Sequence, residues 1–261
     1  MKTKLTQIHP TSVIDKKARL AENVTVGPYS VINGNVEIGE GSEIHSHVYV
    51  ADGARIGKNC KIHHSAAIST VPQDLKFSGE DTLLEIGDNV VIREFCDLNR
   101  GTKHRGKSVI GGNSFLMAYT HVAHDCLVGE NVILANGVQL AGHVTIEEWV
   151  TIGGLVAVHQ FCTIGKYAFV GGGFRVTQDI PPYILAAGVP VNFKGLNIIG
   201  LKRRGFSKEV IDRLQKCYRI LYRSKLNTTQ AVQKIREEVD LIPEVELVLN
   251  FIEKSERGII K

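Results

Sequence analysis

The chain has 261 residues, of which 43% are hydrophobic, and its 31 basic residues outnumber its 27 acidic residues only slightly. A chain of this length can bury one extended core and a small appendage, and so weak a positive charge does not indicate a nucleic-acid partner. No stretch approaches the roughly 18 consecutive apolar residues of a membrane span, and the N-terminus has no apolar signal region. We therefore expect a cytoplasmic protein with no transmembrane segment.

A six-residue repeat of aliphatic residues fills the first two thirds of the chain. Every sixth residue from Ile8 to Val176 is Ile, Leu or Val, except Asp74, Glu80 and His104. Neither the 3.6-residue period of a helix nor the 2-residue period of a strand produces this spacing. A repeat this regular predicts a solenoid of stacked coils.

A second column of small or β-branched residues lies four positions after each aliphatic one, and Gly often follows the aliphatic residue directly, as at Gly27 and Gly165. A short strand that turns a tight corner needs one bulky and one small residue to fill the interior, here called fillers, and one residue that tolerates unusual backbone angles. Three hexads would form an 18-residue triangular coil, and parallel stacking would bury the fillers in one column. The pattern resembles the hexapeptide-repeat proteins, which implies a left-handed parallel β-helix; the handedness comes from the resemblance alone.

We expect this mainly β domain to span residues 1–182 and to end at Pro181 and Pro182, where the ladder loses N–H donors. Two segments without the filler pattern, residues 69–85 and 99–109, should be loops that project from an edge of the solenoid. Four of the five cysteines fall in the small-filler column and form no CxxC pair, which favours buried, unreactive thiols over redox or metal chemistry. They are Cys60, Cys96, Cys126 and Cys162.

After a connector at residues 183–206 the periodicity becomes helical. Residues 207–261 predict a C-terminal helical cap, with helices near 207–225 (N-capped by Ser207), 228–239 and 243–256. Such a cap would cover the last coil, which otherwise is an open sheet edge. The first of these helices and the connector before it are rich in Lys and Arg, so they form either a solvated surface or a docking surface for an acidic partner.

Four histidines lie between residues 121 and 159, and the stacking of coils should bring some of them close to other polar groups. Residues 18 apart should lie one rung above each other, at about 4.8 Å. His124 would then lie under Gly142 and Gly142 under Gln160, while Asp125 would lie under His143. A histidine beside a carboxylate and under a glycine N–H could supply a base, an orienting group and an oxyanion donor for acyl transfer.

Two other interpretations of these histidines remain open. Surface histidines on a solenoid are often only solvated side chains. His121, His124 and His143 could alternatively form a three-histidine zinc site, as in the carbonic anhydrases of this architecture. Because no thiol or further carboxylate clearly completes such a site, we expect no metal.

Six segments, in order along the whole chain, resemble the UDP-N-acetylglucosamine acyltransferases. They are Pro72–Lys76, His121–Cys126, Leu140–His143, Ala157–Cys162, Gln178–Tyr183 and Gly200–Ser207. The resemblance implies a homotrimeric O-acyltransferase that moves an (R)-3-hydroxyacyl chain from acyl carrier protein to the 3-hydroxyl of UDP-N-acetylglucosamine (UDP-GlcNAc). This is the first step of lipid A biosynthesis, and it needs no cofactor beyond the phosphopantetheine of the carrier.

The resemblance also implies residue roles. His124 would be the general base, Asp125 would orient it, and the Gly142 N–H would hold the thioester oxyanion. Gly172 would leave the acyl groove open for a long chain. The other implied substrate-binding residues are Gln73, Asp74 and Lys76 on the first loop, with Asp74 and Lys76 coming from the neighbouring subunit; His121, His143, His159 and Gln160 in the cleft; and Asn197, Arg203 and Arg204 at the nucleotide end.

Two positions depart from the family pattern. Ile199 replaces an acidic residue that contacts the nucleotide, and Phe174 occupies a small-filler position near Gly172. Within acyl transfer, the same reaction on a 3-amino UDP-sugar stays open. The related N-acyltransferase of the same pathway is a second rival, but it has an additional N-terminal domain, whereas coils begin here at residue 8. A zinc carbonic anhydrase or a non-catalytic scaffold of the same fold would share the hexad repeat.

Overall fold

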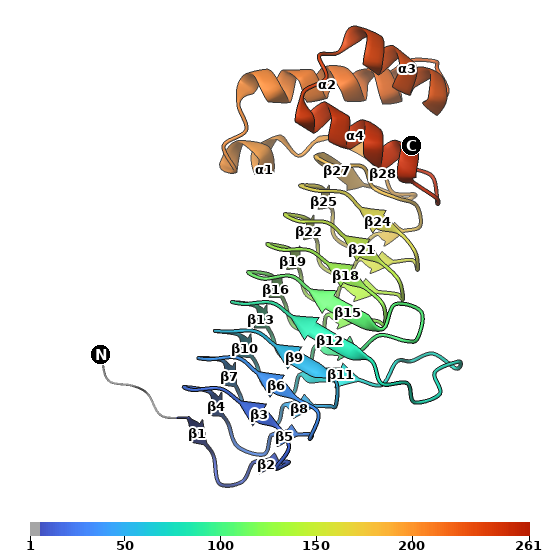
Figure 1. Cartoon of the computed structure of the whole chain (residues 1–261). Coiled ribbons are helices and arrows are strands. Elements are labelled where there is room, and N and C mark those ends of the chain that lie inside the picture. Colours follow the sequence, from blue (N-terminus) through green and yellow to red (C-terminus); the bar gives the residue numbers. More distant parts are fainter. Residues whose placement is uncertain (1–5) are drawn as a thin grey trace.

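The computed structural model describes residues 6–261 as a three-sided column of short coils, capped at its C-terminal end by helices (Figure 1). Its three faces are sheets, here named A, B and C, and each coil contributes one strand to each sheet in that order. Among residues 6–261 the strand pairs of these sheets are parallel, except for the last pair of sheet A, which is antiparallel. The column is the left-handed parallel β-helix that the resemblance to hexapeptide-repeat proteins predicted.

Most strands are only two residues long, as a coil of three hexads requires. Sheet A contains β1 (Gln7–Ile8), β4 (Thr25–Val26), β7 (Glu43–Ile44), β10 (Lys61–Ile62), β13 (Val91–Ile92), β16 (Phe115–Leu116), β19 (Ile133–Leu134), β22 (Thr151–Ile152), β25 (Phe169–Val170), β27 (Ile184–Ala187) and β28 (Asn192–Leu196). Sheet B contains β2 (Val13–Ile14), β5 (Val31–Ile32), β8 (Tyr49–Val50), β11 (Ala67–Thr70), β14 (Asp97–Asn99), β17 (His121–Val122), β20 (Gln139–Leu140), β23 (Ala157–Val158) and β26 (Arg175–Val176). Sheet C contains β3 (Arg19–Leu20), β6 (Glu37–Ile38), β9 (Ala54–Ile56), β12 (Leu83–Ile86), β15 (Lys107–Ile110), β18 (Leu127–Val128), β21 (Thr145–Ile146) and β24 (Thr163–Ile164).

The register of sheet A explains why the hexad frame continues across both loops. Lys61 pairs with Glu43 in the coil below and with Val91 in the coil above, and Val91 pairs in turn with Phe115. The step from Glu43 to Lys61 is the ordinary three hexads, whereas the next two steps are five hexads and four hexads. Because each loop adds only whole hexads, the aliphatic residues after it still face the interior.

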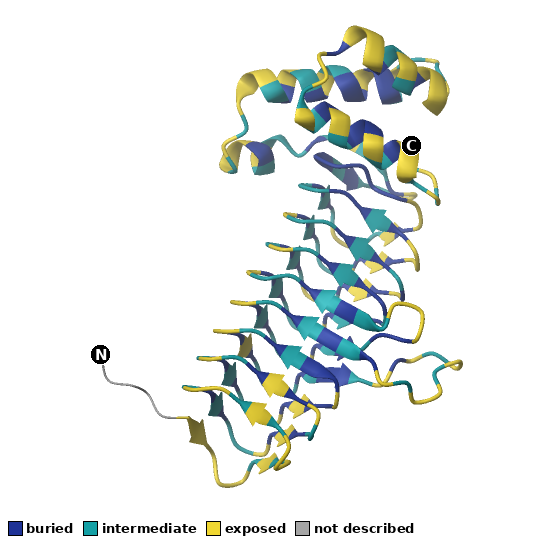
Figure 2. Cartoon of the chain, viewed as in Figure 1, coloured by how far each residue is buried: buried dark blue, intermediate teal, exposed yellow. Residues whose placement is uncertain are grey.

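The core is one continuous column of the aliphatic and small fillers (Figure 2). Ile62, Leu98 and Leu134 are fully buried, whereas the fillers of the first coil are only partly buried, and Ile8 is 49% exposed. The four predicted filler cysteines are buried free thiols, as is Cys217. The expectation that these thiols are buried is confirmed, and burial raises the pKa of Cys126 to about 12.

Both predicted loops project from the edge where sheet B passes to sheet C, here named the B–C edge (Figure 1). They are shorter than the sequence predicted. The strands β11, β12, β14 and β15 extend to three or four residues and pair with each other, which leaves residues 71–82 and 100–106 as loops. The expected limits of 69–85 and 99–109 were wrong because these extended strands lack the filler pattern but still join the ladders.

The expected connector at 183–206 is ordered secondary structure. Strand β27 continues sheet A beyond Pro182 by pairing with β25, and β28 pairs antiparallel with β27. The sheet therefore does not end at the two prolines, which break only the hexad pattern. A short helix, α1 (Ile198–Arg203), follows, and the division of the chain at 182 and 206 stays a prediction.

Three longer helices form the cap: α2 (Lys208–Arg223), α3 (Thr228–Glu238) and α4 (Pro243–Lys254). The predicted N-cap is confirmed, because the Ser207 hydroxyl accepts a hydrogen bond from the Val210 N–H at 3.3 Å. The Tyr218 hydroxyl, buried under α2, donates to the Pro182 carbonyl at 2.6 Å, and Phe193 of β28 stacks on Tyr222. These contacts fix the cap on the end of sheet A. None of the helices in residues 6–261 has both the length and the apolar character needed to cross a bilayer.

Candidate active site

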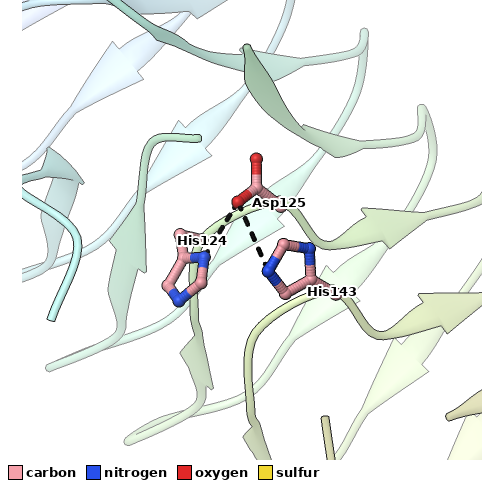
Figure 3. Close-up of side chains that lie close together, drawn as sticks. All are labelled: His124, Asp125 and His143. Carbon is pink, nitrogen blue, oxygen red and sulfur yellow. Dashed lines mark hydrogen bonds and ion pairs between the residues drawn. The ribbon is translucent and has the colours of Figure 1, made fainter. Parts of the chain in front are cut away.

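The B–C edge gathers the residues in which the sequence indicated chemistry. His124 and Asp125 lie between β17 and β18, Gly142 and His143 lie one coil higher, and both loops leave the column at this edge. Asp125 has a φ of 59° and His143 a φ of 64°, because each occupies the corner position of its coil. The corner geometry turns the two side chains toward each other (Figure 3).

His124 lies directly under Gly142, as predicted. A Cβ atom at Gly142 would be 2.6 Å from Cε1 and 2.7 Å from Nε2 of His124, so only glycine leaves room for the ring. The His143 N–H donates to the His124 carbonyl at 3.0 Å, which joins the two coils at this point. Among residues 6–261, no group accepts the N–H of Gly142. That N–H therefore remains available to a substrate oxygen beside the imidazole.

Asp125 is fully buried and is held by more donors than the sequence suggested. Its Oδ2 accepts from Nδ1 of His124 at 2.9 Å and from the Thr102 hydroxyl at 2.7 Å. Its Oδ1 accepts from the backbone N–H groups of Thr102 at 3.0 Å and Arg105 at 3.3 Å. Burial raises the pKa of this carboxyl, but the hydrogen bonds from Thr102 and His124 outweigh it and hold the pKa below its ordinary value. Asp125 is thus a fixed anion beside the imidazole.

His143 completes the cluster. Its Nε2 lies 3.8 Å from Oδ2 of Asp125, its ring stacks on Phe161 with centroids 4.5 Å apart, and the edge of His104 meets it at 4.8 Å. Burial lowers the pKa of His143 below its ordinary value, partly offset by Asp125. His124, Asp125 and His143 offer three ligand atoms within 4.8 Å of one another, so they could hold a metal ion. Asp125 replaces His121 in the three-ligand set that the sequence suggested for zinc.

His121 lies apart from this cluster, on the outer face of sheet B. Its Nδ1 is 3.1 Å from a carboxylate oxygen of Asp97, one coil lower. Asp97 also accepts from Gln73 Nε2 at 3.3 Å and from the Thr70 hydroxyl at 2.7 Å. His121, Asp97 and Gln73, together with Gln139, lie around a hollow of about 320 Å³. The structure therefore brings the predicted residues His121 and Gln73 together around a carboxylate that the sequence did not single out.

The remaining residues of the B–C edge have mostly local contacts. His159 and Gln160 are exposed one coil above Gly142, and His159 Nδ1 lies 3.1 Å from the Gln160 carbonyl. Asp74, in the first loop, accepts from the Lys76 N–H at 3.0 Å. This loop points away from the column (Figure 1), and its Leu75 is fully exposed.

The predicted nucleotide-binding residues lie on a different face, under the cap. Asn197 caps α1 by accepting from the Gly200 N–H at 3.2 Å, and Arg203 and Arg204 end the helix. The guanidinium of Arg204 lies 5.0 Å from the ring centroid of Trp149, and burial lowers its pKa. These residues surround a hollow of about 760 Å³ against the outer face of sheet A, and Ile199, 69% exposed, is part of its wall.

Gly172 is exposed on the edge between sheets A and B. It lies over Gly154, since a Cβ atom built there would meet the Gly154 carbonyl oxygen at 3.0 Å. Phe174 does not project into this edge as a free side chain; it is half-buried and packs against the core. Glycines stacked on successive coils leave this edge open.

Comparisons with known proteins identify the family. A model described as the second domain of UDP N-acetylglucosamine O-acyltransferase matches residues 179–260, and a bacterial transferase hexapeptide model matches residues 17–52, 35–70 and 107–142. A protein of Thiobacillus denitrificans named acyl-[acyl-carrier-protein]–UDP-N-acetylglucosamine O-acyltransferase is 51% identical over 255 residues, covering 97% of this chain and 99% of that protein. The protein of that name from Aliarcobacter butzleri is 47% identical over 98% of both chains. The chain belongs to this acyltransferase family.

Solved structures of the family agree. The UDP-N-acetylglucosamine acyltransferase of Bacteroides fragilis is 44% identical with a TM-score of 0.95, covering 97% of this chain and 99% of its own. The Arabidopsis enzyme is 36% identical with a TM-score of 0.88, covering 97% of this chain and all of its own. The resemblance inferred from six motifs is confirmed, and the chain is an acyltransferase.

Within a single chain, the candidate residues occupy separate places. The base candidate His124 is at the B–C edge, Gly172 is at the A–B edge, and Arg203 and Arg204 are beside sheet A. A triangular column keeps its edges and faces apart.

Sequence reasoning missed three residues that contact the candidate site residues: Thr102, Arg105 and Asp97. The hexad frame could have found Asp97, because it is paired with His121 in sheet B once the second loop is counted as one extra hexad. No repeat signal marks Thr102 or Arg105. They lie in a loop, and only its folded path carries them to Asp125.

Proposed function

We propose that this chain transfers an (R)-3-hydroxyacyl group from acyl carrier protein to the 3-hydroxyl of UDP-GlcNAc, the first step of lipid A biosynthesis, with His124 as general base. The names of its relatives support the two substrates. The observation that carries the mechanism is the position of the His124 ring, between the buried Asp125 carboxylate and the Gly142 backbone.

The hydrogen bond to Asp125 assigns the protons of His124. Because ionised Asp125 can only accept, Nδ1 of His124 carries the hydrogen, and Nε2 of the neutral ring is left with its lone pair. Nε2 is also close to the space beside Gly142. The orientation is therefore that of a base that faces the substrate.

The reaction then follows from these groups. Nε2 of His124 removes the proton of the sugar 3-hydroxyl as its oxygen attacks the thioester carbon. The negative charge moves to the carbonyl oxygen, where the Gly142 N–H donates to it; one such donor is typically worth about 3–4 kcal/mol. The C–S bond breaks, the pantetheine thiolate takes the proton from His124, and the ester and free thiol leave.

The separation of candidate residues supports a shared site. In this proposal the homotrimer brings Asp74 and Lys76 of one subunit to His124 of the next. His121, His143, His159, Gln160 and Gln73 line the cleft, Asn197, Arg203 and Arg204 bind the nucleotide diphosphate, and Gly172 leaves room for a long acyl chain. Arginine suits a diphosphate because its fork can donate two hydrogen bonds.

The carrier protein would dock on the cap, but fewer of the basic side chains there are free to contact it than the sequence suggested. Arg213 pairs with Asp240 at 3.2 Å, and Lys216 donates to the Glu238 carbonyl, so both link α2 to the end of α3. Exposed cations remain on α1, α2 and the turns that follow them. They are Lys202, Arg203, Lys208, Arg219, Arg223 and Lys225.

The test is thioester release from 3-hydroxyacyl carrier protein in the presence of UDP-GlcNAc or its 3-amino analogue. H124A should lower kcat by about 10³-fold, within the range of general-base catalysis, while H9A, at an exposed histidine of the first coil, should not. A rate for H124A within about tenfold of the wild type would overturn the role of His124. Preference for the amino analogue would favour the rival acceptor, and loss of activity on chelation, restored by zinc, would favour a metal enzyme.

A further inference from the structure

Asp125 is buried at a position where the solenoid normally exposes its side chains. The corner residues of neighbouring coils also have positive φ, and Asn113, Tyr119 and Leu155 among them are exposed. Asp125 has the same backbone geometry, with a φ of 59°, but is 0% exposed. Something other than the coil itself therefore covers this carboxylate.

The cover is the second loop, residues 100–106. It donates three hydrogen bonds to the carboxylate: two from Thr102, through its N–H and its hydroxyl, and one from the Arg105 N–H. The Arg105 guanidinium also donates to the Asp125 carbonyl at 2.8 Å. The single hexad that this loop adds to the column thus folds back onto Asp125, the partner of His124.

Thr102 is itself held in one orientation. It is 6% exposed, its carbonyl accepts from the Gly106 N–H at 2.8 Å, and its hydroxyl oxygen accepts from the His104 N–H at 3.2 Å. A hydroxyl has one hydrogen, and with its oxygen already accepting from His104 that hydrogen points to Oδ2 of Asp125. Oδ2 is the same oxygen that accepts from Nδ1 of His124.

We propose that Thr102 is a positioning residue for acyl transfer: its hydroxyl and N–H lock both oxygens of Asp125, and this lock holds His124 in the tautomer and orientation of a base. The inference rests on the proposed role of His124. Without the hydroxyl the carboxylate loses a donor on the oxygen that holds the imidazole, and the ring is free to tilt from Gly142. A small misplacement of a catalytic group is enough to cost about 10²-fold in rate.

The decisive variants are T102V, which keeps the shape and removes the hydroxyl, and T102S, which restores the hydroxyl. T82V is the matched control, because Thr82 is also buried and donates its hydroxyl, at 2.6 Å, to the Gly101 carbonyl at the base of the same loop. T102V should lower kcat by about 10–100-fold with KM nearly unchanged, T102S should stay within about threefold of wild type, and T82V should lose stability without losing kcat.

A double-mutant cycle separates positioning from mere loop structure. If Thr102 acts through Asp125, T102V should cause no further loss of kcat in a D125A background. Equal losses in both backgrounds, an unchanged kcat in T102V, or the same loss in T82V would overturn the proposal. If T102V does not fold by circular dichroism, T102A takes its place with the same criteria.

The H124A variant separates the positioning role of Thr102 from the proposed function of the chain. An inactive H124A together with a fully active T102V would overturn only the positioning role and leave the proposed function intact. An active H124A would overturn both.

Discussion

Two histidine–aspartate pairs lie on adjacent parts of the column and differ in how the carboxylate is held. His124 Nδ1 is 2.9 Å from Asp125, and His121 Nδ1 is 3.1 Å from Asp97. In each pair a threonine hydroxyl also donates to the aspartate at 2.7 Å. By distance alone the two pairs are nearly equivalent.

The two pairs differ in the burial of the carboxylate and in the groups that donate to it. The Asp125 side chain is fully buried under a loop and accepts two backbone N–H groups, whereas that of Asp97 is 34% exposed on a sheet face and is held by side chains. Backbone donors cannot rotate away, so they fix a carboxylate more firmly than side chains do. In the proposed function, the first pair would orient a base and the second would shape a binding surface.

The largest difference should appear on replacing each carboxylate by an amide. D125N should lower kcat by about 10³-fold, because an amide cannot accept from every donor around it and can present its own N–H to His124, which favours the wrong tautomer. D97N should leave kcat almost unchanged and raise the KM for the sugar nucleotide a few-fold. Steady-state kinetics with both substrates measures the two variants, and equal losses of kcat would erase the distinction between the pairs.

A smaller effect should follow from changing the residue stacked over each histidine. G142A places a methyl group 2.6 Å from the His124 ring, which must tilt the imidazole, and we expect kcat to fall about 10²-fold. Q139A changes the residue paired above His121 in sheet B and should alter kcat by less than about threefold, since Gln139 is exposed. Full activity of G142A would mean that the ring has another productive position.

The smallest effect concerns stability at acid pH. For both Asp97 and Asp125, burial raises the pKa but hydrogen bonds to the carboxylate outweigh it, so each pKa lies below its ordinary value. A depressed pKa stabilises the fold above the unfolded value, and this contribution is lost as the pH falls through the folded value.

D125N should therefore lower the free energy of unfolding at pH 7 by about 1–3 kcal/mol, because it leaves buried donors without acceptors. D97N should cost less, because water reaches its site. For both variants, the loss of unfolding free energy relative to the wild type should become smaller as the pH falls below about 4. Urea unfolding between pH 3 and pH 7 measures this, and a deficit that stays constant with pH would contradict the ionic role of the carboxylates.

Much of the molecule could be predicted from the hexads. Their period indicated the coil, and stacking of every third hexad placed His124 against Gly142 and Asp125 against His143. These predictions succeeded because each coil repeats the same backbone path, so a distance in sequence becomes a fixed distance in space. The helical cap was equally accessible, through N-capping by Ser207 and an apolar helical face.

The errors lie where the repeat stops. The strands that border each loop are longer than two residues, and the segment after Pro182 continues sheet A as a hairpin although it has no hexads. Hydrogen bonds between backbone groups hold these segments in the sheets. Because backbone groups form such bonds whatever the side chains are, the segments leave no periodic signal in the sequence. Sequence periodicity reports only which residues face the core.

The sequence by itself determined the three-sided column, the family and the stacking of His124 beneath a glycine, because all three follow from periodic burial and ordered motifs. Only the tertiary structure decided that Thr102 and Arg105 close over Asp125, that Asp97 partners His121, and that Arg213 and Lys216 bind within the cap. The reason is physical: loops and helix surfaces obey no repeat, and their polar groups take whichever partners the folded chain brings within hydrogen-bonding distance.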